Sequence, residues 1–224
     1  MAQRQGGKVI KHQQTIEQSA GNQRSVHQGS INQGWWEAAC RVDSPNQDQR
    51  PEGEVSLLLL HAISLPPGQF HGDAIEALFL NRLDPDADKF FSEIAHLRVS
   101  AHLLIRRDGK CVQFVSFEAR AWHAGRSHWF DAHVEQWRQA LNDFSVGIEL
   151  EGDDETPFTQ AQYHALACVT KTLMDCYPSL TPERITSHAQ VAPLRKTDPG
   201  PAFDWKYFRG CLAKQPSKTF KTVV

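Results

Sequence analysis

The fold is decided around Val55-Ser-Leu-Leu-Leu-Leu-His61, which contains the longest uninterrupted aliphatic run of the chain. The loop-forming residues Ser64-Leu-Pro-Pro-Gly68 follow closely. A short apolar run that leads into a loop signal is typical of a strand buried on both faces of a sheet. We therefore predict a central strand here, with the polar side chain of His61 at its end.

Helical and strand patterns alternate along the rest of the chain. The turn Arg107-Asp-Gly109 lies between two apolar runs and predicts a β-hairpin. Helices are expected from Asp73, from the capping box of Thr159 and Gln162 to about Tyr177, and from Asp204. Strands interspersed with helices, one strand being centrally buried, predict an α/β (α+β mixed) fold with a central mixed β-sheet flanked by helices.

The segment Phe144-Ser-Val-Gly-Ile-Glu-Leu-Glu151 alternates between apolar and other residues. Because side chains alternate between the two faces of a strand, one face belongs to the core and the other presents Glu149 and Glu151. These carboxylates face either a functional site or, if the strand lies at the edge of the sheet, the solvent. The alternation does not choose between the two glutamates.

Length and charge limit the classes of partner. The chain has 224 residues, which fits one domain plus a tail at roughly 150 residues per domain. It has 24 Lys and Arg against 26 Asp and Glu, a formal charge of −2, so we expect neither nucleic acid nor a membrane as a partner. The longest aliphatic run is also far shorter than the roughly 20 residues that cross a bilayer.

Composition divides the sequence into three parts. Residues 1–33 are rich in glutamine and lack any helical or strand periodicity, so we expect this extension to be disordered. The folded domain is predicted to span residues 34–213, followed by a short tail, 214–224. The five cysteines are an odd number without a CxxC pair, and no apolar signal block follows the first residues. We therefore expect reduced thiols and a cytoplasmic protein.

A second segment, from Ser187 to Pro201, gives His61 a possible function. It has little periodicity, yet it contains His188 and Asp198 among three prolines. Loops stiffened in this way hold ligands without regular secondary structure. Two imidazoles and one carboxylate form an open Zn²⁺ site, in which the fourth position is left for a water molecule whose pKa falls to about 7. The alternative is a solvated loop in which Asp198 only begins a turn.

Hydrolysis at such a metal also needs a proton acceptor and a group that stabilises negative charge. Glu149 or Glu151 offers a carboxylate for the first task. Lys196, two residues before Asp198, offers an ammonium group for the developing oxyanion. The common role of a single lysine is solvation, and that alternative stays open for Lys196.

Two further segments are candidates for substrate binding. Trp122 and His123 precede two small residues, a composition that suits the close approach of a sugar or a peptide. A structural Trp with a capping His is equally compatible with this motif. The polar residues of segment 96–102 share one parity, which predicts a strand whose polar face lets Arg98 hold a carboxylate by two hydrogen bonds. The alternative is an ordinary exposed face.

Five blocks of the sequence resemble, in the same order, the AmpD amidases, which are N-acetyl-anhydromuramoyl-L-alanine amidases of cell-wall recycling. The blocks are LLLHAISLPPGQF, IAHLRVSAHLLIRRDGKCVQFV, RAWHAG, NDFSVGIELEGDD and APLRKTDPGPAFDW. The resemblance covers about residues 35–212. It implies the fold shared with phage lysozyme-type amidases and peptidoglycan recognition proteins, with a zinc site at the strand ends.

The resemblance also implies roles for individual residues. The implied ligands of Zn²⁺ are His61, His188 and Asp198. Glu149 is implied to be the catalytic carboxylate, which resolves the choice that alternation leaves open. Lys196 is implied to stabilise the transition state, and Arg98 to meet a carboxylate of the stem peptide.

The implied reaction is hydrolysis of the amide between the lactyl group of 1,6-anhydro-N-acetylmuramic acid and L-alanine of the stem peptide, in cytosolic muropeptides. We expect a monomer whose partner is this small molecule. The alternatives are an amidase that acts on polymeric peptidoglycan and a non-catalytic module that binds muropeptides. The family pattern has Asn where this chain has Ala62, a difference expected to affect substrate affinity more than the metal site.

Overall fold

The predicted central strand is β5 (Leu57–Ile63) in a computed structural model that describes residues 29–216. It belongs to a six-stranded sheet of order β12-β5-β11-β6-β7-β3. The other strands of this sheet are β12 (Ile185–Ser187), β11 (Ser145–Glu151), β6 (Leu103–Ile105), β7 (Cys111–Gln113) and β3 (Cys40–Arg41). The four leucines of β5 have no exposed surface, and β5 lies between two parallel neighbours. The prediction of a buried central strand is confirmed, although β5 continues two residues beyond His61.

The sheet is mixed, as the sequence predicts. β11 runs parallel to β5 and to β6, and β12 runs parallel to β5. β6 and β7 form the antiparallel hairpin expected around Arg107-Asp-Gly109. Gly109 has a φ of +84°, a conformation that glycine adopts without steric cost.

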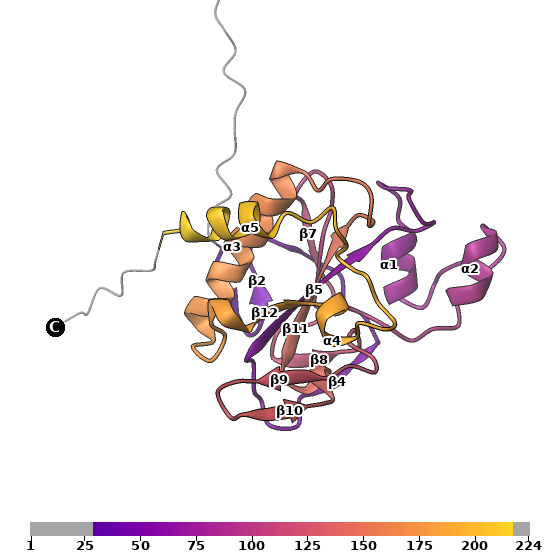
Figure 1. Cartoon of the computed structure of the whole chain (residues 1–224). Coiled ribbons are helices and arrows are strands. Elements are labelled where there is room, and N and C mark those ends of the chain that lie inside the picture. Colours follow the sequence, from indigo (N-terminus) through magenta and orange to yellow (C-terminus); the bar gives the residue numbers. More distant parts are fainter. Residues whose placement is uncertain (1–28, 217–224) are drawn as a thin grey trace, which may run out of the picture.

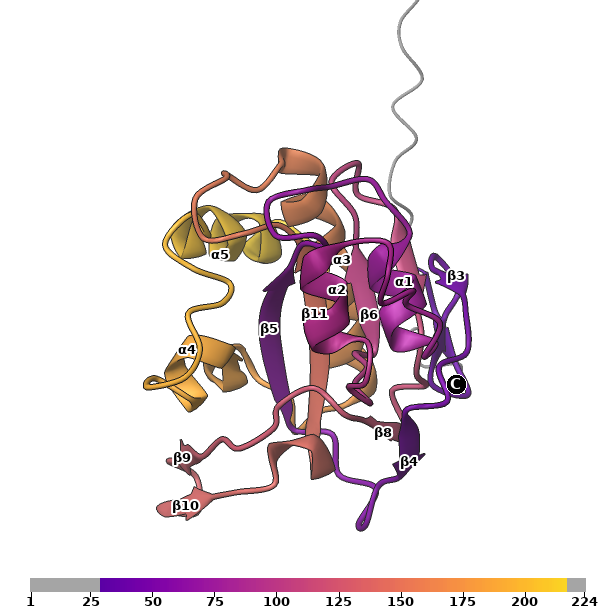
Figure 2. The ribbon, with the colours of Figure 1, turned by 90° about the vertical axis from the view of Figure 1, so that its right-hand side faces the viewer.

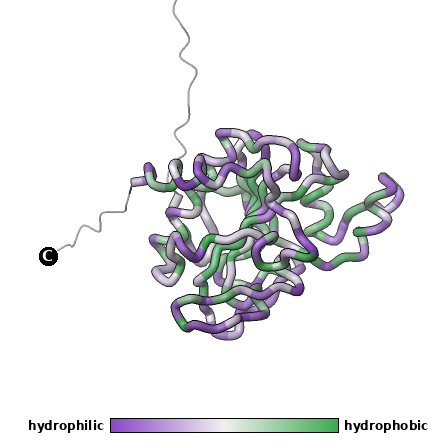
Figure 3. Tube along the Cα trace, in the orientation of Figure 1, coloured by the Kyte–Doolittle hydropathy of each residue, from purple (hydrophilic) through white to green (hydrophobic). Residues whose placement is uncertain are grey.

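Helices cover both faces of this sheet. Figures 1 and 2 show α3 (Gln160–Cys176) and α5 (Trp205–Ala213) on one face, and α1 (Ala74–Phe79) and α2 (Lys89–Ile94) on the other. A separate apolar cluster fills the space on each face. The hydropathy of the trace is accordingly highest along the central strands and lowest in the peripheral loops (Figure 3).

The helix ends confirm most of the capping predictions. Thr159 and Gln162 form a complete capping box at the start of α3, and the side chain of Asp204 accepts a hydrogen bond from the backbone of α5. Asp73 stands at the start of α1 but makes no side-chain capping bond.

Three short antiparallel pairs, two 3₁₀ turns and the short helix α4 complete the fold. The pairs are β1 (Ile31–Asn32) with β2 (Trp35–Trp36), β4 (Gln47–Gln49) with β8 (Ala119–Ala121), and β9 (Trp129–Asp131) with β10 (Gln136–Arg138). Single 3₁₀ turns lie at Leu141–Asp143 and Pro182–Arg184, and α4 spans His188–Val191.

The predicted start of the folded domain needs correction, and most of the predicted extension and tail lies outside the described residues. β1 lies inside the segment 1–33 that the sequence predicts to be disordered. Ile31 packs against the core beside α3 and pairs with Trp36, so residues 31 and 32 belong to the folded domain. Residues 1–28 and 217–224, which hold most of the predicted extension and tail, lie outside the described part of the chain.

The strand predicted over residues 96–102 is wrong. These residues form a turn and an irregular segment after α2, and regular pairing begins only at Leu103. Two polar residues of the segment are buried because hydrogen bonds satisfy them. The hydroxyl of Ser100 donates to the Asn46 carbonyl, and the ring of His102 accepts the Gly147 N–H.

The two faces of β5 and β11 separate the core from the site. Leu58 and Leu60 pack with Val146 and Ile148 in the cluster beneath α3. The opposite parity carries His61 on β5 and Ser145, Gly147 and Glu149 on β11. The parallel register pairs Glu149 with His61, so their side chains leave the same face of the sheet side by side. Because β11 pairs with β5 on one side and with β6 on the other, it is not an edge strand, and that alternative for Glu149 and Glu151 is wrong.

Candidate active site

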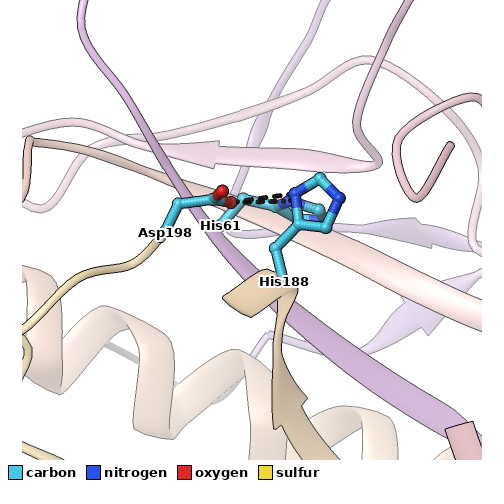
Figure 4. A group of neighbouring side chains, drawn as sticks. All are labelled: His61, His188 and Asp198. Carbon is cyan, nitrogen blue, oxygen red and sulfur yellow. Dashed lines mark hydrogen bonds and ion pairs between the residues drawn. The ribbon is translucent and has the colours of Figure 1, made fainter. Parts of the chain in front are cut away.

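Three side chains from distant parts of the sequence converge beside β5. Figure 4 shows His61, His188 and Asp198 pointing toward one another. The Nδ1 atoms of the two histidines are 3.0 Å apart. Asp198 Oδ2 lies 3.1 Å from His61 Nδ1 and 3.0 Å from His188 Nδ1. The three residues predicted as metal ligands therefore offer one ligand atom each to a common point.

Local structure fixes each of the three residues. His61 stands on β5 and is 2% exposed. His188 is the first residue of α4, where Ser187 forms a capping box with Gln190, so the turn from β12 into α4 sets its direction. Asp198 lies in the loop before α5, and its carbonyl accepts the N–H of Ala189 in α4. That bond ties the loop to the element that carries His188.

The geometry fits a tetrahedral metal ion. Ligands at about 2.0–2.1 Å from Zn²⁺ are separated by about 3.3 Å when the coordination is tetrahedral. The observed separations of 3.0–3.1 Å are close to this edge length. Two neutral imidazoles and one carboxylate are a donor set that Zn²⁺ prefers, and three protein ligands leave a fourth position open.

The electrostatics of the three residues agree with this donor set. Burial lowers the pKa of His61 to about 4, so its imidazole is neutral at pH 7. Burial by itself would raise the pKa of Asp198, but hydrogen bonds from His188 and His61 hold that pKa well below its usual range. A neutral imidazole and an ionised carboxylate are the protonation states that bind metal.

Each histidine uses its second ring nitrogen for a further contact. His188 Nε2 lies 3.2 Å from the Ala124 carbonyl, and His61 Nε2 lies 2.9 Å from His123 Nδ1. With Nδ1 directed at a metal, Nε2 carries the proton and donates it in both contacts. These contacts set the tautomer of both ligands.

Glu149 and Glu151 have different surroundings. The Oε2 atom of Glu149 is buried and has no hydrogen-bond partner among the described residues. Burial and the negative charge of Asp198 raise the pKa of Glu149 well above 4.5, and the charge of Lys196 opposes this shift. The carboxylate of Glu151 instead accepts the N–H groups of His71 and Arg107 at 2.6 and 3.0 Å. Of the two glutamates, only Glu149 therefore has a carboxylate free for proton transfer. It lies beside the triad, the name used below for His61, His188 and Asp198.

A polar cavity of about 520 Å³ opens beside Asp198. Its lining includes the basic residues Arg195 and Lys196 and the acidic residues Asp153 and Asp154. Its volume is within the usual range for small-molecule sites. A larger groove of about 680 Å³ lies between α3 and α5, away from the elements that carry the triad.

Comparison with known proteins gives the family. The family model described as N-acetylmuramoyl-L-alanine amidase matches residues 51–201. The chain belongs to this amidase family. It is 55% identical over 186 residues to the 1,6-anhydro-N-acetylmuramyl-L-alanine amidase AmpD of Escherichia coli K12, an alignment that covers 83% of this chain and 98% of the relative. The resemblance to the AmpD amidases is thereby confirmed.

Solved structures agree with this assignment. A crystal structure of AmpD matches the amidase with a TM-score of 0.77 and 52% identity, covering 81% of this chain and 98% of the other. The amidase AmiD of E. coli, in complex with its substrate anhydro-N-acetylmuramic acid-L-Ala-D-γ-Glu-L-Lys, matches with a TM-score of 0.50 and 29% identity over 70% of this chain and 57% of the other. The mixed α/β fold is thus the fold of this family.

Two predicted substrate-binding residues of the amidase make their contacts away from the triad. The exposed guanidinium of Arg98 lies beside the carbonyls of residues 95–97, at 3.3–3.5 Å, because the segment is a turn and not a strand. The pKa of Asp48 is lowered chiefly by its hydrogen bonds from Arg120 and in smaller part by the side chain of Trp122, so Trp122 interacts with Asp48. His123, in contrast, touches His61 directly.

Sequence reasoning missed the residues that hold the neighbours of the histidine ligands in place. The side-chain oxygen of Asn142 accepts the N–H groups of His123 and Ala124 at 3.2 and 2.8 Å, which fixes the two residues that contact the histidine ligands. Ser145 Oγ lies 3.2 Å from His123 Nε2. One signal was available, because Gly147 interrupts a buried strand, and such glycines often mark a close approach.

Among residues 29–216, no helix of the amidase has both the length and the apolar character needed to cross a bilayer. No disulfide joins any of the five cysteines, all of which lie within the described residues. Cys111 and Cys168 are buried, whereas Cys176 is exposed at the end of α3.

Proposed function

We propose that this amidase uses bound Zn²⁺ to hydrolyse the amide between the lactyl group of 1,6-anhydro-N-acetylmuramic acid and L-alanine of the stem peptide. The observation that carries the proposal is the convergence of His61, His188 and Asp198 on one point, with Glu149 on the neighbouring strand. The E. coli relative at 55% identity bears this activity in its name, and AmiD was solved with a substrate of this chemistry.

The chain's own residues divide the chemistry between them. When bound, Zn²⁺ supplies a Lewis acid that polarises the amide carbonyl and lowers the pKa of the attacking water. Glu149 takes a proton from that water as it attacks the carbonyl carbon, and it returns the proton to the alanine nitrogen as the C–N bond breaks. The Oε2 atom of Glu149 suits this role because no donor within residues 29–216 competes for it.

Lys196 stabilises the negative charge that develops on the carbonyl oxygen. It lines the cavity beside Asp198, and its positive charge reaches Glu149, where it opposes the raised pKa of that carboxyl. An ammonium group placed in this way favours the charged transition state over the neutral amide. The products are the free stem peptide, with its new amino terminus, and the free lactyl carboxylate.

The substrate occupies the polar cavity beside Asp198 in this proposal. Its basic and acidic lining residues offer partners for the carboxylates and the amine of a stem peptide. Ala62 also lines this cavity, at the position where the family pattern has Asn. Substrate binding by Arg98 and Trp122 stays a prediction from the sequence.

We further propose that the amidase acts in the cytoplasm on muropeptides released during peptidoglycan recycling. The absence of disulfides among the five cysteines, all within the described residues, supports a reducing compartment. A monomeric state, and the lack of nucleic-acid and membrane partners, stay predictions from charge and composition. We assign the amidase domain to the residues from β1 to the end of α5 at Ala213.

The test is a chromatographic assay on an anhydromuramoyl tripeptide and, separately, on intact peptidoglycan sacculi, each with and without a zinc chelator. We expect release of free tripeptide from the soluble substrate, lost with chelator and restored by Zn²⁺. Release from sacculi in preference to the tripeptide would favour the polymer amidase. Binding without release, in protein that contains zinc, would favour the non-catalytic module.

A further inference from the structure

We infer that His123 is a positioning residue, which holds His61 in the orientation and tautomer that present Nδ1 to the metal. The inference rests on the metal set of the proposed function and adds a residue that lies outside that set. His123 Nδ1 lies 2.9 Å from His61 Nε2, and the two rings meet edge to face with centroids 5.0 Å apart. Only the ring nitrogen of His61 that faces away from the triad makes this contact.

The proton positions follow from chemistry. If His61 Nδ1 gives its lone pair to the metal, the single proton of the neutral ring is on Nε2. His61 then donates to His123 Nδ1, which must be the unprotonated nitrogen of that ring. The proton of His123 is therefore on Nε2, which donates to Ser145 Oγ at 3.2 Å. The hydrogen bonds from His61 through His123 to Ser145 are mutually consistent in one arrangement.

The backbone around His123 is built to hold this ring. Asn142 accepts the N–H groups of His123 and Ala124, so the dipeptide is fixed as a unit. The Ala124 carbonyl lies 3.2 Å from His188 Nε2. Adjacent residues of one segment therefore orient the two histidine ligands, one through a side chain and the other through a carbonyl.

Gly147 supplies the space that the ring occupies. A Cβ atom at position 147 would lie 2.4 Å from His123 Nδ1 and 2.5 Å from its Cγ, far inside contact distance. The neighbour of Gly147 on β5 is Leu59, two residues before His61. A side chain at position 147 would therefore push His123 out of the place from which it reaches His61.

This placement separates two possible roles of His123. A residue that binds substrate presents a ring nitrogen to the cavity, whereas both ring nitrogens of His123 are used within the protein. Partners that orient metal-bound histidines typically contribute about 10–100-fold to metal affinity. We therefore expect His123 to affect the affinity for zinc, and the turnover only through the metal.

The test compares two variants of nearly equal size in the full chain, His123→Asn and His123→Leu. Asn places Oδ1 where His has Nδ1 and keeps an acceptor for His61, whereas Leu offers none. Zinc affinity is measured by competition with a chromophoric chelator. We expect His123→Leu to weaken zinc binding by about 10–100-fold and His123→Asn to restore most of the affinity. His164→Leu, which removes an exposed imidazole from α3, is the matched control and should leave zinc affinity unchanged.

A spectroscopic measurement tests the tautomer directly. In ¹⁵N NMR of the zinc-loaded chain, we expect His61 and His123 each to carry the ring proton on Nε2; a proton on Nδ1 of His123 would overturn this arrangement. If His123→Leu does not fold, Ser145→Ala provides the milder test, because it removes the acceptor of His123 and leaves the ring. It should weaken zinc binding by a smaller factor.

The outcomes distinguish this inference from the proposed function. If the unaltered chain binds no zinc, the metal set itself is wrong. If the unaltered chain binds one zinc and a folded His123→Leu binds it equally well, the positioning role is overturned. In that case a raised KM for the tripeptide would return His123 to substrate binding.

Discussion

Replacement of Glu149 by glutamine tests the proposed chemistry most sharply. Glutamine keeps the shape of the side chain on β11 but cannot accept a proton from water. General acid–base catalysis contributes typically about 10²–10⁴-fold, so we expect kcat to fall by this factor. At about 1.36 kcal/mol per tenfold, the loss corresponds to about 2.7–5.5 kcal/mol of transition-state stabilisation.

The fold and the metal site should survive this change. Oε2 of Glu149 has no hydrogen-bond partner that the substitution could remove. Burial and the nearby charge of Asp198 already disfavour the ionised carboxylate, as its raised pKa indicates. A neutral amide in the same place therefore costs the folded state little. Zinc content should stay at the level of the unaltered chain, because the three ligand atoms are contributed by other residues.

Glu151→Gln is the matched control, two residues further along the same face of β11. The carboxylate of Glu151 accepts two backbone N–H groups, from His71 and Arg107. A glutamine has one side-chain oxygen for these two donors, so one of them loses its acceptor. The expected cost is about 1–3 kcal/mol in the free energy of unfolding. The kcat of the folded variant should stay close to that of the unaltered enzyme.

The assay is the release of tripeptide from the anhydromuramoyl tripeptide, with zinc content measured on the same samples and stability measured by urea unfolding. The reasoning fails if Glu149→Gln, with full zinc content, keeps activity within about tenfold of the unaltered enzyme. It also fails if folded, zinc-loaded Glu151→Gln is the variant that loses turnover.

Three further predictions concern the metal, the cavity and the stability of the fold. His61→Ala should lose both zinc affinity and turnover, measured by chelator competition and tripeptide release; muropeptide binding that His61→Ala retains, in a protein whose unaltered chain releases no tripeptide, would favour the non-catalytic module. Ala62→Asn, which restores the amide of the family pattern in the cavity, should lower KM and leave zinc content unchanged, and an unchanged KM would dismiss this position as a determinant of affinity. Asp131→Asn should lower the free energy of unfolding at neutral pH by about 3–5 kcal/mol in urea titrations, because the buried guanidinium of Arg184 then loses the carboxylate that it binds through two contacts of 2.9 Å. Burial opposes the ionisation of Asp131, but the hydrogen bond from Arg184 keeps the pKa of Asp131 lowered. The stabilisation is therefore present above about pH 3.9, the unfolded pKa, and is lost as the pH falls through the lower folded pKa. If Asp131→Asn lost stability in acid as the unaltered chain does, Asp131 would not be the group responsible.

Features with local signals could be predicted from the sequence. The apolar run before His61 predicts β5 because burial on both faces needs no polar alternation. The capping box at Thr159 begins α3 through hydrogen bonds within a few residues. The hairpin around Gly109 depends on a single backbone conformation. In each case the interaction that decides the structure is close in sequence.

Features that depend on distant pairing could not be predicted in the same way. Glu149 and Glu151 share one parity, and only the register of β11 against β5 places Glu149 beside His61. Asn142 and Ser145 carry no motif, and their importance follows from the position of His123, which comes from another segment. The alternation around Arg98 misled because a turn can carry the same spacing of polar residues as a strand.

The alternate residues of β11 link the metal site to the fold. On the face toward the site, Ser145 contacts His123, Gly147 makes room for its ring, and Glu149 lies beside His61. A glycine within a strand costs about 0.5–1 kcal/mol relative to alanine, so its place here is explained by the ring that fills the space. On the opposite parity, Val146, Ile148 and Leu150 pack beneath α3. From Ser145 to Leu150, substitutions along this one strand should therefore alternate in effect, with metal binding or turnover affected on one parity and the stability of the fold on the other.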